Sequence, residues 1–111
     1  MEQYKIIYTD AAANDIVVKF KYIVNVLHDR ATAERWYIRL KETIQQDLSF
    51  MPEKYQLYDE GPWRSEGVRL FVTRQDVVLY SVDKSAHTVY IWAVCTAGRD
   101  LTAHMEETHE K

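Results

Sequence analysis

Hydrophobic residues in the first half of the chain follow two different spacings. Residues 4–8 alternate, with Tyr4, Ile6 and Tyr8 on one side, which is typical of a short strand. Apolar positions then recur every three or four residues, which predicts an amphipathic helix that begins after an N-cap at Thr9 and ends near His28. The expected buried stripe of this helix consists of Ala12, Ile16, Phe20, Ile23 and Leu27.

A second helix is predicted over residues 30–51. Asp29 can cap its first turn, and Pro52 ends it, because a proline disfavours helical backbone at the residue before it. Few residues separate the two helices, so they should form an antiparallel hairpin. The expected buried stripe of the second helix consists of Ala33, Tyr37, Leu40, Ile44, Leu48 and Met51.

Three further strands are predicted over residues 67–73, 76–83 and 87–96, after an irregular stretch at 52–66. Their separators are short enough for hairpins, so the expected fold class is α+β. In this fold a strand and two helices precede a three-stranded antiparallel meander, and the helical hairpin packs on the sheet. Both faces of the last two strands are apolar. One face should meet the helices, and the other needs a cover, either the chain's own tail or a partner.

The single cysteine, Cys95, alternates in phase with Val89, Ile91 and Ala93, so we expect all four side chains on one strand face. A lone cysteine forms no intramolecular disulfide, which favours a reducing compartment. The N-terminus has no long apolar run, so neither a signal peptide nor a membrane span is expected. The predicted location is the cytoplasm.

Length and charge narrow the classes of partner. The 111 residues fit a single domain spanning 1–111, with 14 Lys and Arg against 17 Asp and Glu and a net charge of −3. This balance argues against broad, charge-driven nucleic-acid binding but leaves a local basic patch open. The sequence has no glycine-rich phosphate loop, and His28 and His87 lack His, Cys or carboxylate partners at ligand spacing. Glu106, His109 and Glu110 are close in sequence, but a three-residue cluster in the tail is weak evidence for zinc, so we expect no cofactor and no metal.

Several segments, taken in order, indicate a family. They are YKIIYTDAAAND from residue 4, FMPEKYQLYDE at 50–60, the strands GVRLF, VVLYSVD and VYIWAV, and GRD at 98–100. This order resembles the RelE/ParE superfamily of bacterial toxins from type II toxin–antitoxin systems, which includes plasmid stabilisation proteins. The resemblance covers roughly residues 4–100. It implies a growth-inhibiting toxin that a cognate antitoxin neutralises, within a RelE/ParE-like fold.

The chain departs from the family pattern in three ways. Many members have a tyrosine–arginine pair where the third strand begins, whereas this chain has Asp76 and Val77. Members are commonly basic, and this chain is acidic. Where RNA-cleaving members place a tyrosine or histidine after the arginine turn, this chain has His104 and Met105. These departures affect the expected catalytic set more than the expected fold.

In the RNA-cleaving branch, the resemblance implies catalysis by Arg69, Arg99 and His104. Cleavage through the 2′-hydroxyl needs a proton-transfer group and cations around the phosphate, and a histidine titrates near neutrality. Arg69 could cluster with Arg74 and Arg99. The alternative is that Arg69 and Arg74 are solvated strand and turn residues, with His104 on a tail next to two glutamates that repel phosphate. Whether the chain is an enzyme is left open.

In the binding branch, the chain inhibits DNA gyrase by contact. The residues expected to bind a target or partner are Arg74, Arg99, Trp63, Tyr90 and Trp92. Arg99 beside Asp100 can grip a phosphate or carboxylate, or it can merely fasten the chain end. Trp63 is either an interface anchor or a lid on the core.

The binding branch is the first hypothesis. The alternative is a ribosome-dependent mRNA endonuclease, and a further alternative is an inactive member that only binds antitoxin. All imply a cognate antitoxin, a segment of which folds on binding. DNA gyrase or the ribosome with its mRNA is the target in the first two, and the expected assembly is a homodimer or a toxin–antitoxin heterotetramer.

Overall fold

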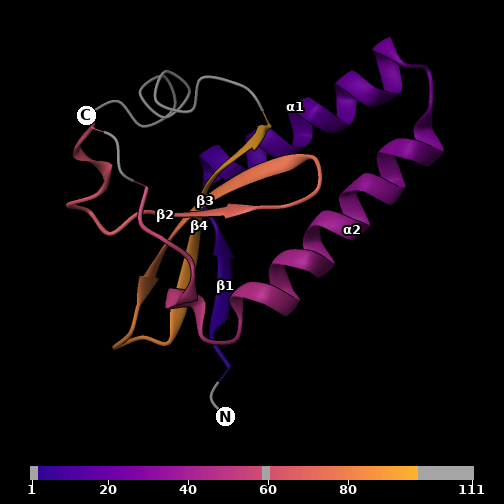
Figure 1. The fold of residues 1–111 in the computed structure, drawn as a ribbon. Helices are drawn as coiled ribbons and strands as arrows, with labels where there is room; N and C mark the ends of the chain where they lie inside the picture. Colours follow the sequence, from indigo (N-terminus) through magenta and orange to yellow (C-terminus); the bar gives the residue numbers. More distant parts are fainter. Residues whose placement is uncertain (1–2, 59–60, 98–111) are drawn as a thin grey trace.

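A computed structural model describes residues 3–58 and 61–97. The described residues form two α-helices and a four-stranded sheet, in the arrangement of Figure 1, which confirms the predicted α+β class. The elements are β1 (Lys5–Tyr8), α1 (Asp10–Val26), α2 (Arg30–Leu48), β2 (Arg69–Val72), β3 (Asp76–Asp83) and β4 (Thr88–Thr96). Two 3-10 turns, Pro52–Lys54 and Gly61–Trp63, lie between α2 and β2.

The sheet has the order β1-β4-β3-β2. Strands β2, β3 and β4 pair antiparallel as the predicted meander, and β1 joins β4 in parallel. The Thr9 hydroxyl strengthens this junction, because it donates to the carbonyl oxygen of Ile91 at 2.9 Å. The first helix therefore starts from a point fixed on the central strand.

The helices pair as an antiparallel hairpin, whose linked ends project beyond the sheet (Figure 1). Both predicted N-caps are confirmed: Thr9 accepts from the backbone of Ala12, and Asp29 accepts from the backbone of Thr32. The hydrogen bonds from Thr32 also lower the pKa of Asp29. The caps set where each helix begins and thus which side chains face the sheet.

Both helices end earlier than predicted. Helix α1 stops at Val26, and His28 has φ 53°, in the left-handed region. Helix α2 stops at Leu48, and Met51 has φ 46° just before Pro52. Two residues assigned to buried stripes thus lie past the helix ends, and both side chains are exposed, Leu27 by 56% and Met51 by 64%.

The main core lies between the helices and one face of the sheet. Trp36 takes the place predicted for Tyr37: its side chain is only 7% exposed, while Tyr37 is 39% exposed. Trp36 lies three residues after Ala33 and four before Leu40, so it completes the buried stripe of α2. The buried members of this cluster are Ala12, Ile16, Ile23, Ala33, Trp36, Leu40, Ile44, Leu48, Phe71, Val78, Tyr80, Val89, Ile91 and Val94.

A second cluster occupies the opposite face of the sheet. Tyr58, Trp63 and Val68, from the segment before β2, pack over residues of β3 and β4. The buried strand residues beneath them are Val77, Leu79, Ala93 and Cys95. Tyr58, Trp63 and Val68 of the chain itself thus cover these strand residues, a possibility that the prediction of a tail or partner did not include.

A bulge in β4 overturns the prediction that Cys95 shares a face with Val89 and Ile91. Tyr80 pairs with Ile91, and Leu79 pairs with Ala93, so Trp92 is an extra residue between them. An extra residue reverses the alternation of side chains beyond it. Val89 and Ile91 therefore face the helices, whereas Ala93 and Cys95 lie in the second cluster.

Candidate binding groove

A groove runs between α2 and the turn that joins β2 to β3. Its volume is about 520 Å³. The α2 residues along it recur every three or four positions from 32 to 47, so they form one face of the helix, roughly 22 Å long at 1.5 Å per residue. The groove is lined by Thr32, Arg35, Trp36, Arg39, Leu40, Thr43, Asp47, Phe71, Val72, Thr73, Arg74, Gln75 and Asp76.

Three arginines line this groove. Arg35 and Arg39 are one helical turn apart on α2, and Arg74 comes from the turn that forms the other wall. Arg35 donates to the hydroxyl of Thr32 at 3.0 Å. Arg39 and Arg74 are exposed and form no hydrogen bond or ion pair with any residue in the described part of the chain. An acidic chain therefore concentrates guanidinium groups with unused donors at one place.

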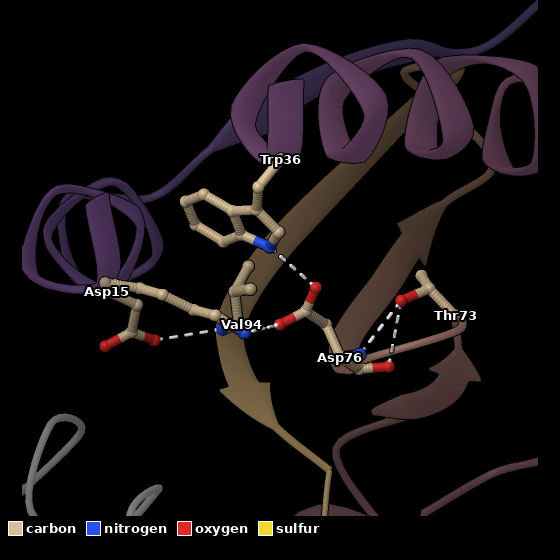
Figure 2. Close-up of polar contacts among 6 residues, drawn as sticks. Asp15, Trp36, Thr73, Asp76 and Val94 are labelled. Atoms are coloured by element: carbon tan, nitrogen blue, oxygen red, sulfur yellow. Dashed lines mark hydrogen bonds and ion pairs between the residues drawn. The ribbon is translucent and has the colours of Figure 1, made fainter. Parts of the chain in front are cut away.

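The groove contains a buried carboxylate, that of Asp76, which is already neutralised. One oxygen pairs with the ammonium group of Lys19. The other accepts from Nε1 of Trp36 at 2.9 Å (Figure 2). The backbone of Asp76 exchanges two hydrogen bonds with the hydroxyl of Thr73 (Figure 2). Because Lys19 neutralises the carboxylate of Asp76, this carboxylate does not cancel the positive charge of the arginines that line the groove.

This network joins both helices to the sheet. Lys19 comes from α1, Trp36 from α2 and Asp76 from the start of β3. Close by, Asp15 of α1 accepts from the backbone nitrogen of Val94 at 2.9 Å (Figure 2). Sequence reasoning noted position 76 only as a departure from a family pattern, because its partners lie 57 and 40 residues away and no local pattern connects them.

Arg69, a candidate for catalysis, has a different environment. Its Nη1 donates to the carbonyl oxygens of Glu53 and Tyr55, at 3.2 and 2.6 Å, and its Nη2 lies 3.7 Å from the carboxylate of Glu53. The hydroxyl of Tyr80 donates to the carbonyl of Pro52, and burial is the main cause of its raised pKa. Arg69 and Tyr80 thus fasten residues 52–55 to the sheet.

Arg69 and Arg74 do not share a cavity. Arg69 lines a second hollow of about 470 Å³, on the side of β2 where residues 56–58 lie. Arg64 lines the same hollow. The two arginines that were expected to cluster thus line different hollows, and Arg74 lines a groove with Arg35 and Arg39, neither of which was a candidate from the sequence.

The aromatic candidates lie on the sheet face away from the helices. Trp63 is 6% exposed and belongs to the second cluster, as the lid alternative describes. Tyr90 and Trp92 are partly buried, with ring centroids 6.2 Å apart. Nε1 of Trp92 donates to the hydroxyl of Ser81 at 2.7 Å. These two rings offer part of an aromatic surface.

The candidates Arg99 and His104, with the neighbouring Asp100, lie outside the described residues. Within residues 3–58 and 61–97, no group of three His, Cys, Asp or Glu side chains is placed to hold a metal ion. Over the same ranges, no helix combines the length and apolar character needed to cross a membrane.

Comparison with known proteins identifies the fold. No protein-family model matches the chain, and no curated protein matches its sequence. A chain of the toxin–antitoxin complex RelBE2 from Mycobacterium tuberculosis is 19% identical, with a TM-score of 0.66, and the match covers 89% of this chain and 97% of that one. A chain of the chromosomal ParDE toxin–antitoxin system from P. aeruginosa is 18% identical, with a TM-score of 0.65, covering 85% and 96%. The RelE/ParE-like fold predicted from the sequence is confirmed.

Proposed function

We propose that the chain is the toxin of a type II toxin–antitoxin system, neutralised by a cognate antitoxin, and that it acts by binding and inhibiting DNA gyrase. Its fold is that of chains from the RelBE2 and ParDE complexes, both of which are toxin–antitoxin systems. The fold alone does not separate a binding toxin from an RNA-cleaving one. The environment of particular side chains supports the choice between them.

The single observation that carries the choice is that Arg69 already uses its hydrogen-bond donors within the fold. Its guanidinium already serves two backbone carbonyls and lies beside the carboxylate of Glu53. A catalytic cation must instead point its donors at the phosphate, where charge develops. Turning Arg69 toward a phosphate would leave the carbonyls of Glu53 and Tyr55 without this donor, at a cost of about 1–3 kcal/mol for each one left unsatisfied. Arg69 therefore suits a role in the fold better than one in catalysis.

The groove supports a binding role directly. Exposed arginines beside a largely buried tryptophan are typical of the residues that contribute most to protein–protein interfaces. Arg39 and Arg74 are available for such contacts, and Val72, which is 59% exposed, supplies apolar surface in the same groove. In this proposal Arg74 keeps the partner-binding role expected from the sequence, and Tyr90 with Trp92 forms a second contact surface on the other face of the sheet.

A ribosome-dependent mRNA endonuclease is the second candidate. The arginines of the groove favour it, because a guanidinium binds a phosphate as readily as a carboxylate. In that case Arg74 and Arg39, rather than Arg69, would hold the RNA backbone, with Arg99 and His104 completing the site. A third candidate is a chain that retains only antitoxin binding.

The outer surface of α1 supports a protein partner. It exposes Val17, Val18, Tyr22 and Val26, each by between 46% and 58%, and the C-cap residue Leu27 is exposed by 56%. Large apolar side chains gathered on one helix mark an interaction surface. We expect the chain alone, in the cytoplasm of its host, to be poorly soluble or self-associated, and co-expression with its antitoxin to cure this. A stable monomer that binds no hydrophobic dye would contradict the expectation.

Pulse labelling within minutes of induction in a bacterial host tests the proposal. Incorporation of labelled thymidine should fall while incorporation of labelled methionine continues, because a gyrase inhibitor stops replication first. An immediate collapse of protein synthesis would favour the endonuclease. Normal growth despite accumulation of folded chain would favour the third candidate.

A further inference from the structure

We infer that the groove between α2 and the β2–β3 turn is the docking site for an acidic, amphipathic segment of the antitoxin. The inference rests on the proposed function, since it names the chemistry of the partner at one site. In this arrangement carboxylates of the segment pair with Arg35, Arg39 and Arg74. Apolar side chains of the same segment cover the floor of the groove.

The groove is positively charged, and this charge favours an acidic occupant. Arg35 and Arg39 line the wall formed by α2, and Arg74 lines the wall formed by the β2–β3 turn. Arg39 and Arg74 have no hydrogen-bond or ion-pair partner among the described residues. Asp76 is occupied by Lys19 and Trp36, so Asp47 is the remaining carboxylate of the lining. Guanidinium groups pair with carboxylates through two parallel hydrogen bonds. The complementary ligand is therefore an anion with more than one carboxylate.

The floor of the groove is the second argument. Trp36 and Leu40 of α2 and Phe71 and Val72 of β2 line it. Val72 is 59% exposed, which is a large fraction for a valine on a strand. The core already buries Trp36, Leu40 and Phe71, so Val72 supplies most of the apolar surface that a ligand can reach. Exposed apolar surface between walls that carry arginines fits a peptide with leucine-like side chains between its acidic ones. Small inorganic anions and sugar–phosphate chains have nothing to place there.

The length of the groove is the third argument. The lining residues of α2 span roughly 22 Å, which matches about 15 residues of a helix or about 7 residues of extended chain. The charge along it is asymmetric, because Arg35 and Arg39 lie toward the N-terminal half of α2 and Asp47 lies near its C-terminus. The acidic part of the segment should therefore lie beside Arg35 and Arg39, and a neutral or basic part beside Asp47.

Nucleic acid fits the groove less well. Binding to a phosphate backbone draws on the net positive charge of a surface, and this chain carries −3. The carboxylate of Asp47 would repel a strand that followed the whole length of α2. A protein segment avoids this repulsion, because its own charge can change along its length.

Affinity measurements on the complex of the full chain with its co-encoded antitoxin test the inference. Arg39→Glu and Arg74→Glu should each raise the dissociation constant by roughly 10-fold or more. This is the loss of affinity expected when a charge-assisted pair is replaced by repulsion. Arg39→Lys should lie between them and wild type, because it keeps the charge but loses the fork. The matched control is Lys84→Glu, which makes a charge change of the same sign at an exposed position of the β3–β4 turn, outside the groove.

The possible results separate the inference from the proposed function. If Arg39→Glu and Arg74→Glu bind antitoxin as tightly as wild type, the inference is wrong, while the toxin–antitoxin pairing stands because the complex still forms. If wild type neither forms a complex nor arrests growth, the proposed function fails and the inference fails with it. If a labelled oligoribonucleotide loses affinity for Arg39→Glu while antitoxin affinity is unchanged, the groove belongs to nucleic acid.

Photocrosslinking identifies the occupant. We would place p-benzoylphenylalanine at Gln75, an exposed residue of the groove wall, and in a control at Ser85, an exposed residue of the β3–β4 turn. In the toxin–antitoxin complex, position 75 should crosslink to a segment of antitoxin that is both acidic and apolar, and position 85 should not. Crosslinks from position 75 to residues 98–111 of the same chain, to a second copy, or to nothing in an intact complex would overturn the inference.

Discussion

Arg69, at the start of β2, and Arg39 and Arg74, in the groove, form two arginine sites that differ in what their guanidinium groups already contact. Arg69 donates to the carbonyl oxygens of Glu53 and Tyr55, and its side chain is 20% exposed. Arg39 and Arg74, in the groove, are exposed and have no partner among the described residues. The donors of Arg69 are thus used within the fold, whereas those of Arg39 and Arg74 are not used by the described residues. An arginine whose donors are unused is the better candidate for binding another molecule.

The comparison also explains how an acidic chain can have a basic binding site. Net charge counts every ionisable group equally, but a buried pair such as Lys19 with Asp76 contributes almost nothing to the outside field. The groove keeps its positive character because its buried carboxylate is neutralised from below. Asp76 therefore has two roles: it links the helices to the sheet, and it lines the groove.

The largest effect should follow from removing that carboxylate. Asp76→Ala leaves Lys19 without its counter-charge and Nε1 of Trp36 without its acceptor, so we expect a loss of about 3 kcal/mol in the free energy of unfolding. Urea denaturation followed by far-UV circular dichroism measures it. Asp76→Asn keeps the shape and an acceptor, so its loss should be smaller. A loss below about 0.5 kcal/mol for the alanine variant, the range of ordinary surface substitutions, would mean that the network does not hold the helices to the sheet.

The second prediction concerns Arg69, whose donors are used within the fold. Arg69→Met keeps most of the aliphatic bulk but removes the donors to two carbonyls, so we expect a loss of about 2 kcal/mol in the free energy of unfolding. The same urea titration measures it. Unchanged stability would show that the carbonyls find water instead, and Arg69 would return to the list of functional candidates.

Tyr80→Phe tests the same segment as Arg69→Met, but it removes only one hydrogen-bond donor. The hydroxyl of Tyr80 is the donor to the carbonyl of Pro52, and Arg69 holds the neighbouring carbonyls. We expect a loss of about 1 kcal/mol in the free energy of unfolding. Because both side chains fasten the same segment, the double variant with Arg69→Met should lose less than the sum of the two single losses. Strict additivity would mean that the two contacts act independently.

The smallest effect on stability is expected in the groove. Arg39→Met removes an exposed cation with no partner among the described residues, so the free energy of unfolding should change by less than about 0.5 kcal/mol. Thermal denaturation beside Arg69→Met provides the direct contrast. A loss as large as that of Arg69→Met would erase the distinction between the two sites.

Most of the fold could be predicted from the sequence, because its signals are local. The caps at Thr9 and Asp29 and the alternation along β3 lie within a few residues of the elements they define. The placement of Tyr37 in the buried stripe was wrong, because Trp36 occupies that place. Both positions fit a helical spacing, and only the orientation of α2 on the sheet decides between them.

The features that could not be predicted depend on contacts between distant residues. Trp92 adds a residue to β4 only because of how β3 pairs with it, and the altered phase moves Cys95 to the other face. Asp76 acquires its role from Lys19 and Trp36, on two different helices. Arg69 and Arg74 are close in sequence, yet they line different cavities. The assignment of Arg69 as catalytic and of Arg74 as partner-binding stays a prediction.

The central claim is that the chain acts by binding, with Arg69 serving the fold. The most direct measurement is primer extension on mRNA from a bacterial cell-free translation extract supplied with the purified chain. The account predicts no new mRNA 5′ ends with wild type. The account would be contradicted by new 5′ ends that appear with wild type and disappear with an Arg69→Lys variant whose urea midpoint is unchanged.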